Sequence, residues 1–193
     1  MKTSTLSQIF FSLLVLLSTS TVYGQTISGK VSDQQSLIAL PGIDIDVFEA
    51  SNPSVNIGGG LTNSLGNYTV TLPGAGTYIL RADAAPSDGV SDEYYNNQLL
   101  KSQATQITVG GTQNVTGINL DLPRGVFLSG KVTSSSSGLG LNLIDMDLYH
   151  SSGEFMGSFS SSTLSDGSYS FGAVPPGNYY IAADPNPTLG QLF

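Results

Sequence analysis

Two pairs of aspartates stand at spacings that could support metal binding or acid–base catalysis. Asp44 and Asp46 form one pair, and Asp145 and Asp147 form the other. In a β-strand, side chains two positions apart share a face and lie about 6.6 Å apart. Clustered carboxylates suit Ca²⁺, and two carboxyl groups can cleave a glycosidic bond. No Asp-x-Asp-x-Asp-Gly loop is present, and a solvated strand face explains the spacing, so we expect neither role.

The other candidates for catalysis lack the partners that their chemistry requires. His150 is the single histidine, and the chain has no Gly-x-Ser-x-Gly sequence to supply a serine nucleophile. Gly58, Gly59 and Gly60 are not followed by Gly-Lys-Ser/Thr, so they favour a bulge or hairpin over a phosphate loop. The sequence therefore predicts a protein that is not an enzyme and needs no cofactor.

Four adjacent residues could form a carbohydrate-binding surface: Tyr94, Tyr95, Asn96 and Asn97. Exposed aromatic rings can stack on sugar rings, and amides can hydrogen-bond sugar hydroxyl groups. The alternative is structural: one tyrosine packs over a sheet edge and the asparagines form turns. Both interpretations stay open at this point. Residues 93–102 are also the one segment expected to hold a helical turn.

The composition excludes several functional classes. The 193 residues carry 6 Lys and Arg against 14 Asp and Glu, for a net charge of -8 and a pI near 4.2. Binding to nucleic acid needs basic patches, so no nucleic acid partner is expected. Without cysteine the chain can form neither a disulfide framework nor a zinc ribbon, and it has no thiol nucleophile.

The N-terminus has the layout of a secretory signal peptide. Lys2 gives a short basic start, and residues 9–17 form an apolar run. Small or medium-sized residues precede Gln25, where the mature chain is expected to begin. This run is too short to span a bilayer about 30 Å thick, and no later stretch is long enough. We therefore predict cleavage of residues 1–24, no membrane span afterwards, and a secreted or cell-surface protein of bacterial type.

One unit occurs twice along the chain. At an offset of 101, residues 28–83 and 129–184 align without a gap and share 18 identities over 56 positions. The sequence Ser-Gly-Lys-Val begins both copies, and Ile-Asp-x-Asp follows in both. Identity at a fixed period indicates a tandem duplication.

Each copy alternates apolar and polar residues with the period of a strand. In the first copy Tyr78, Leu80 and Ala82 alternate with Ile79, Arg81 and Asp83, and the second copy keeps the same parity. Residues 107–109 and 115–122 look like two closing strands joined by a turn at Gly110 and Gly111. With about seven strands a unit, the pattern predicts an all-β protein of two tandem β-sandwich domains.

The two predicted sandwiches occupy residues 25–122 and 126–193, with a stiff linker at 123–125. The second is incomplete, because Phe193 corresponds to Asp92 and nothing corresponds to residues 93–122. Two exposed sheet edges are expected as a result. We therefore also expect these residues to be part of a longer chain.

The order of these motifs resembles a known family. Gly29-Lys30-Val31-Ser32 is followed by a Leu-Pro-Gly turn, by Gly-Asn-Tyr-Thr-Val at residues 66–70 and by Gly-Thr-Tyr-Ile-Leu at residues 76–80. This series is similar to the carboxypeptidase regulatory-like domain, a transthyretin-like β-sandwich. The second copy departs from it at Asn142 and Leu143. The resemblance implies a non-catalytic extracellular accessory module, although fold does not fix function.

Related collagen-adhesin B-type domains can carry a Lys–Asn isopeptide bond promoted by a buried acid. Lys30 and Lys131 lie in the first strand of each copy, but their parity places them outward. Where such domains carry a glutamate, this chain has Arg81-Ala82 and Ala182-Ala183. We interpret both lysines as solvated strand residues.

The functional expectation is a structural spacer or an adhesion module. The first alternative is a carbohydrate-binding module that uses residues 94–97, and the second is the accessory region of a larger secreted enzyme. The expected partner is a polysaccharide or another surface protein.

Overall fold

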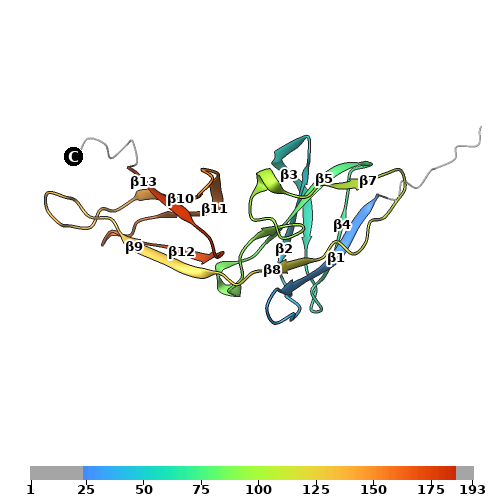
Figure 1. The fold of residues 1–193 in the computed structure, drawn as a ribbon, viewed down its shortest axis with the longest axis horizontal. Helices are drawn as coiled ribbons and strands as arrows, with labels where there is room; N and C mark the ends of the chain where they lie inside the picture. Colours follow the sequence, from blue (N-terminus) through green and yellow to red (C-terminus); the bar gives the residue numbers. More distant parts are fainter. Residues whose placement is uncertain (1–23, 186–193) are drawn as a thin grey trace, which may run out of the picture.

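The computed structural model describes residues 24–185, except for the side chains of residues 157–160 and 185. The predicted signal peptide lies outside the described residues apart from Gly24. The described chain is all-β, as predicted, with two short 3-10 turns and no helix long and apolar enough to cross a membrane. Its two halves lie end to end along the longest axis (Figure 1).

The N-terminal half, residues 24–122, has two sheets. The first has the order β4-β1-β8, from Asn67–Thr71, Thr26–Asp33 and Leu120–Leu122. The second has the order β3-β2-β5-β6, from Asn52–Leu61, Asp44–Glu49, Gly76–Asp83 and Glu93–Tyr94, and β7 (Ile107–Val109) also pairs with β5. The core between the sheets contains the residues that the parity had placed inward, including Ile45, Val47 and Leu80.

The two closing segments of this half are not a hairpin, which corrects the expectation from sequence. Strand β7 pairs with β5 in one sheet, whereas β8 pairs in parallel with β1 in the other. The turn at Gly110 and Gly111 therefore begins a crossover between sheets. Both segments are apolar because they cover one core from opposite sides.

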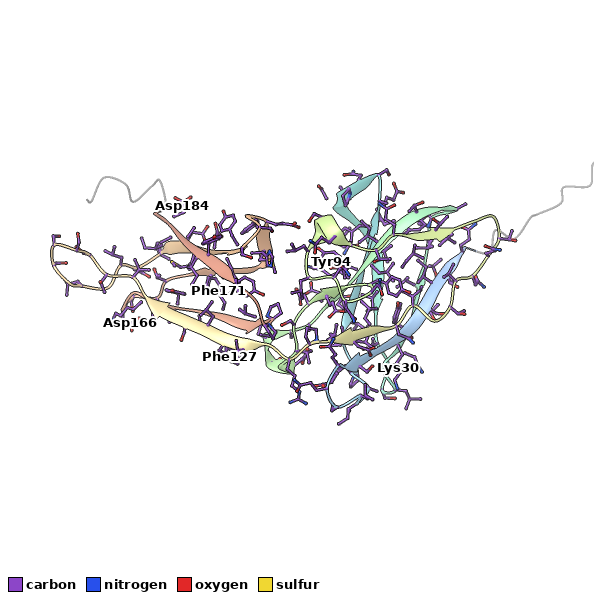
Figure 2. All side chains as sticks on the ribbon, in the orientation of Figure 1. Lys30, Tyr94, Phe127, Asp166, Phe171 and Asp184 are labelled. Carbon is purple, nitrogen blue, oxygen red and sulfur yellow. The ribbon has the colours of Figure 1, made fainter. Side chains whose placement is uncertain are left out.

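The C-terminal half, residues 126–185, repeats the arrangement with fewer strands. Strands β9 (Val126–Lys131) and β12 (Ser168–Val174) form a two-stranded sheet. The facing sheet has the order β11-β10-β13, from Phe155–Ser162, Ile144–His150 and Tyr179–Pro185. The core between them includes Met146, Leu148 and Phe171, and Figure 2 shows Phe171 between the two sheets.

Buried hydrogen bonds of the two copies correspond atom by atom. The backbone N–H of Ile43 donates to Thr62 Oγ1 (2.9 Å), and Ile144 donates to Thr163 Oγ1 at the same distance. Each threonine hydroxyl in turn donates to a carbonyl 22 residues earlier in the chain. The hydroxyl groups of Tyr78 and Tyr179 also each donate to a carbonyl four residues before them. The repeat seen in the sequence is therefore a repeat of buried geometry.

The glycine run lies directly beside a bulge in β3. The register of β2 against β3 shifts between Val47 and Phe48, opposite Gly58 and Asn56. A side chain at Gly59 would place its Cβ 1.9 Å from the carbonyl oxygen of Ile45, so the close approach of the strands requires glycine there.

Of the two 3-10 turns, one overlaps the end of the segment 93–102 where a single helical turn was expected, and the other lies before it. They lie at Pro86–Asp88 and Lys101–Gln103, and Glu93–Tyr94 is a short strand on the edge of β5 instead. The segment between them wraps over the outer face of the β3-β2-β5-β6 sheet, and this covering creates the candidate site.

Candidate functional site at the junction of the halves

The predicted sugar-stacking surface does not form as an exposed platform. The Tyr94 side chain is 8% exposed and packs with Phe48 and Ile79 on the outer face of the second sheet. Tyr95 is half-buried, and Asn96 and Asn97 adopt left-handed turns with φ of 68° and 57°. The structural alternative describes this segment better, and the structure gives no support to carbohydrate binding there.

The outer face of this sheet is a second buried surface that the parity argument missed. Asp46 was predicted to face solvent but is buried, whereas Asp44, two positions earlier on the same face of β2, is exposed. Asp46 lies under the segment that carries Tyr94, and a buried carboxylate requires a charged or hydrogen-bonding partner. The expectation that both aspartates form a solvated face is therefore wrong for Asp46.

That partner is Arg81, which stands directly opposite Asp46 in the strand register. Its Nε and Nη2 both donate to Asp46 Oδ2, at 3.0 and 2.6 Å. Nη2 also donates to Asp83 Oδ2 at 2.6 Å, and Nη1 lies 3.8 Å from Asp92 Oδ2. Asn56 donates to the other oxygen of Asp46. One guanidinium thus binds three aspartates.

The charges in this cluster shift one another's protonation. Burial disfavours the charged guanidinium, but the hydrogen bond to Asp46 and the charges of Asp83 and Asp92 outweigh burial and raise the pKa of Arg81. Burial, and then the charge of Asp92, raise the pKa of Asp83 to about 6, although Arg81 opposes the shift. The cluster therefore carries a carboxyl group whose pKa, about 6, is well above the ordinary value for aspartate.

A cavity of about 570 Å³ opens beside this cluster, between the two halves. Arg81, Asp83 and Tyr94 line it from one side, and Glu154 and Met156 line it from the other. Figure 2 shows Tyr94 on the side of the N-terminal half that faces the C-terminal half.

The walls of the cavity are held together by contacts across the junction. Leu100 of the N-terminal half is 4% exposed and belongs to the buried cluster of the C-terminal half, with Met146 and Phe171. Ser102 donates to Glu154 from its backbone N–H (3.2 Å) and from its hydroxyl. The hydroxyl of Ser91 donates to the carbonyl of Ala173. These contacts fix the two halves relative to each other.

The predicted linker, residues 123–125, is itself part of the packing. Arg124 Nε lies 2.9 Å from Asp33 Oδ2, and the backbone of Arg124 forms a bridge with Val90. A Cβ on Gly125 would come within 2.2 Å of Ala173, so only glycine allows this approach. The linker residues thus contact both halves.

The remaining sequence candidates lie apart from one another. Lys30 and Lys131 are both exposed, as the strand parity predicted, and Figure 2 shows Lys30 on the N-terminal half. His150 Nδ1 lies 2.9 Å from Ser152 Oγ in a hairpin turn. Asp145 is exposed. Burial, and then the charges of Asp145 and Asp184, raise the pKa of Asp147. Among residues 24–185, no group of three His, Asp or Glu side chains is placed to hold a metal ion.

Glu93 is a residue that the sequence did not single out. It is 2% exposed, and its Oε1 has no hydrogen-bond partner. Burial, and then the charge of Asp121, raise the pKa of Glu93 to about 8. The signal available in the sequence was a carboxylate directly before the Tyr-Tyr pair, but its burial depends on the short strand β6, which no periodicity indicated.

Comparison with known proteins yields distant structural likenesses. No protein-family model and no curated protein matches the chain. Among solved structures, the chain is similar to the Bacillus anthracis TIE protein, with 16% identity and a TM-score of 0.40 over 84% of this chain and 28% of that one. The streptococcal ancillary pilin gives 15% identity and a TM-score of 0.40, over 88% of this chain and 56% of that one.

A third likeness is to the shaft pilin SpaA from Lactobacillus rhamnosus GG, with 11% identity and a TM-score of 0.33, over 85% of this chain and 88% of that one. The chain thus spans less than two thirds of the length of the first two proteins. At these TM-scores the likenesses carry no functional argument. The resemblance to the carboxypeptidase regulatory-like family stays a prediction.

Proposed function

We propose that this chain is a non-catalytic, secreted or cell-surface module in which two β-sandwich domains form a stiff structural spacer that carries interaction surfaces. The domains are residues 25–122 and 126–193, joined by residues 123–125. The predicted signal peptide and the accessory role implied by the family resemblance support this proposal. The partner class is another surface protein.

The observation that carries the proposal is the insertion of Leu100 into the core of the C-terminal half. A leucine that leaves water for a neighbouring core stabilises the junction by about 2 kcal/mol. The three residues of the linker are also too few to let the halves move independently. A spacer needs a fixed orientation of its two halves, because only then does it hold the groups at its two ends at a defined distance.

The junction cavity is better suited to holding the halves than to catalysis. Arg81 lies within ion-pair distance of Asp46, Asp83 and Asp92, so its positive charge already interacts with carboxylates of the protein. Catalysis by charge stabilisation needs groups that are poised for a substrate instead. The cluster of Arg81 and its aspartates is therefore better interpreted as a set of ion pairs that stabilises the segment carrying Leu100.

The test is the distribution of distances between the halves. The chain has no cysteine, so cysteines at Ser54 and Ser137, both exposed, give two unique sites for spin labels. Pulsed electron spin resonance should give one narrow distance distribution for the otherwise unchanged protein. Leu100→Ser should broaden it, because the junction loses its apolar anchor.

The control is Leu37→Ser, at a leucine that is 70% exposed in the N-terminal half. This change should leave the distribution narrow. A broad distribution in the unchanged protein would show that the halves move independently, and the spacer proposal would fail.

A further inference from the structure

The cavity at the junction is lined by more acidic than basic side chains. Asp83 and Asp92 line it from the N-terminal half, and Glu154 lines it from the C-terminal half. Arg81 binds Asp83 and the buried Asp46 and lies 3.8 Å from Asp92, so one guanidinium is shared by three aspartates. Among residues 24–185, Glu154 forms no ion pair.

Lys101 also lines the cavity, but its charge is directed to other groups. Its Nζ donates to the carbonyl oxygen of Pro53 at 3.0 Å and lies 4.6 Å from the centre of the Phe48 ring. An ammonium over an aromatic face is attracted by the negative face of the ring. Within the described part of the chain, no carboxylate pairs with Lys101. The described walls of the cavity therefore carry an excess of negative charge.

Two carboxylates on the same wall each keep an oxygen that can accept a hydrogen bond. Asp83 uses Oδ2 for Arg81, and no described residue donates to its Oδ1. Asp92 uses Oδ1 for the backbone N–H of Ala84, and its Oδ2 is 3.8 Å from Arg81 Nη1, beyond hydrogen-bond distance. Burial, and then the charge of Asp92, raise the pKa of Asp83, as expected for a carboxyl group that gains too little positive charge from its surroundings.

The hydroxyl of Tyr94 is a third polar group on this wall. The Tyr94 side chain is only 8% exposed and lines the cavity, and its hydroxyl forms no hydrogen bond with another described residue. Burial raises the pKa of Tyr94 to about 12, and the charges of Arg81, Asp92 and Glu154 also act on it. The hydroxyl therefore stays neutral and can both donate and accept. A buried polar group without a partner is uncommon in a folded protein, and here it indicates a binding position.

The remaining walls are largely apolar, and the cavity is large enough for a small molecule. Leu99, Phe155 and Met156 line it opposite or beside the polar groups. Its volume of about 570 Å³ lies within the range of small-molecule pockets. The residues that line it come from both halves and lie between Arg81 and Ala173. The walls of the cavity therefore do not depend on residues near the end of the sequence.

We propose that the junction cavity binds a primary ammonium group carried on a short apolar chain. The three N–H donors of an ammonium match Oδ1 of Asp83, Oδ2 of Asp92 and the hydroxyl oxygen of Tyr94. The apolar chain then lies against the wall that the C-terminal half supplies. A metal ion fits less well, because no three His, Asp or Glu side chains among residues 24–185 are placed to hold one. The inference goes beyond the spacer role but rests on its fixed junction, because the ligand contacts both halves.

The probe is n-pentylamine, titrated into the whole isotope-labelled protein and followed by nuclear magnetic resonance. The amide resonances of residues 83–94 and 154–156 should shift and saturate with a Kd of about 1 mM, as expected for a ligand of this size. Pentanoate has the same length and the opposite charge, so it should not bind. The neutral n-pentanol should bind about tenfold more weakly, because it offers one donor and no charge.

The same ammonium can come from a free amine or from a lysine side chain of a surface protein. Nα-acetyl-lysine methylamide presents a lysine side chain between two peptide groups. Tighter binding of this lysine derivative would identify a protein side chain as the source, and tighter binding of pentylamine would identify a free amine. Either result supports an ammonium site.

Two protein variants test the proposed contacts. Tyr94→Phe removes only the hydroxyl and keeps the packing with Phe48 and Ile79, and it should weaken pentylamine binding about fivefold. Asp83→Asn removes one negative charge at a side chain that is 42% exposed, so the fold should persist while binding weakens about tenfold. Asp184→Asn makes the same change at the equivalent exposed position of the other half and should leave the Kd unchanged.

Three results would overturn the proposal. The first is the absence of a saturable shift at pentylamine concentrations well above the expected Kd. The second is equal binding of pentylamine and pentanoate, which would show an apolar site that does not select for charge. The third is unchanged binding in both Tyr94→Phe and Asp83→Asn, which would place the amine elsewhere. The spin-label distances are measured without amine, so a narrow distribution in a protein that binds no amine would reject this site and leave the spacer proposal intact.

Discussion

The two halves of this molecule begin from the same sequence pattern and reach different degrees of completion. The main core cluster of the N-terminal half contains 18 buried residues among those described, and that of the C-terminal half contains seven, one of which is Leu100 from its neighbour. The repeated hydrogen bonds of Thr62 and Thr163 are nevertheless the same. Local strands and turns thus follow from the repeated pattern, whereas closure of a core depends on residues that cover it.

The strongest test of this contrast truncates one equivalent position in each half. Leu80→Ala should destabilise the N-terminal half by about 3 kcal/mol, because it leaves a cavity in a closed core. Ile181→Ala should cost the C-terminal half about 1 kcal/mol, because this side chain is already partly in water. Urea unfolding followed by pulsed hydrogen exchange measures each half separately. Equal losses at the two positions would contradict the difference in closure.

The second test removes the side chain that the C-terminal half borrows. Leu100→Ala should lower the unfolding free energy of the C-terminal half by about 2 kcal/mol and leave that of the N-terminal half nearly unchanged. Leu37→Ala, at an exposed leucine, is the matched control. If Leu100→Ala lowers the unfolding free energy of the N-terminal half instead, Leu100 stabilises its own half and not the C-terminal one.

Glu93 should make the stability of the N-terminal half fall as the pH rises from about 4.5 to about 8. Its folded-state pKa of about 8 is above the ordinary value, so stability is fully present below pH 4.5 and is lost as pH rises through 8. Glu93→Gln should remove this loss, with a gain of about 2 kcal/mol at pH 9 relative to pH 6. The measurement is urea unfolding of the N-terminal half at both values of pH. A pH dependence that survives in Glu93→Gln would assign it to another group.

The smallest effect expected is at Asp83. Its pKa is also raised, to about 6, so the stability of the N-terminal half should fall as the pH rises from about 4 to 6 and should stay constant above pH 6. Because its side chain is 42% exposed, solvent screening leaves about 1 kcal/mol that Asp83→Asn should abolish. Unfolding curves between pH 4 and 7 test this. Asp184→Asn, at the equivalent exposed position of the other half, controls for the loss of one negative charge. An unchanged slope in Asp83→Asn would show that Arg81 holds this carboxylate charged throughout.

Much of the fold was predictable because the sequence contains the same unit twice. A parity kept in both copies identified the inward side chains, and Ile45 and Leu80 are buried accordingly. The inference failed at Asp46, because alternation describes one covered face, whereas a loop covers the other face of this sheet. Alternation also could not foresee Leu100, whose environment is formed by residues from the other copy. Long-range coverage of this kind leaves no periodic signal in the segment that supplies it.

The parallel pairing of β1 with β8 has a mechanical consequence. The chain enters this half through β1 and leaves it through β8, which leads within three residues to β9. Tension applied along the chain therefore pulls β1 and β8 in opposite directions along their common axis. The backbone bonds between Val31–Asp33 and Leu120–Leu122 are then loaded together in shear, instead of opening one after another as a zipper does. The same pairing that completes the core thus also acts as a clamp against extension.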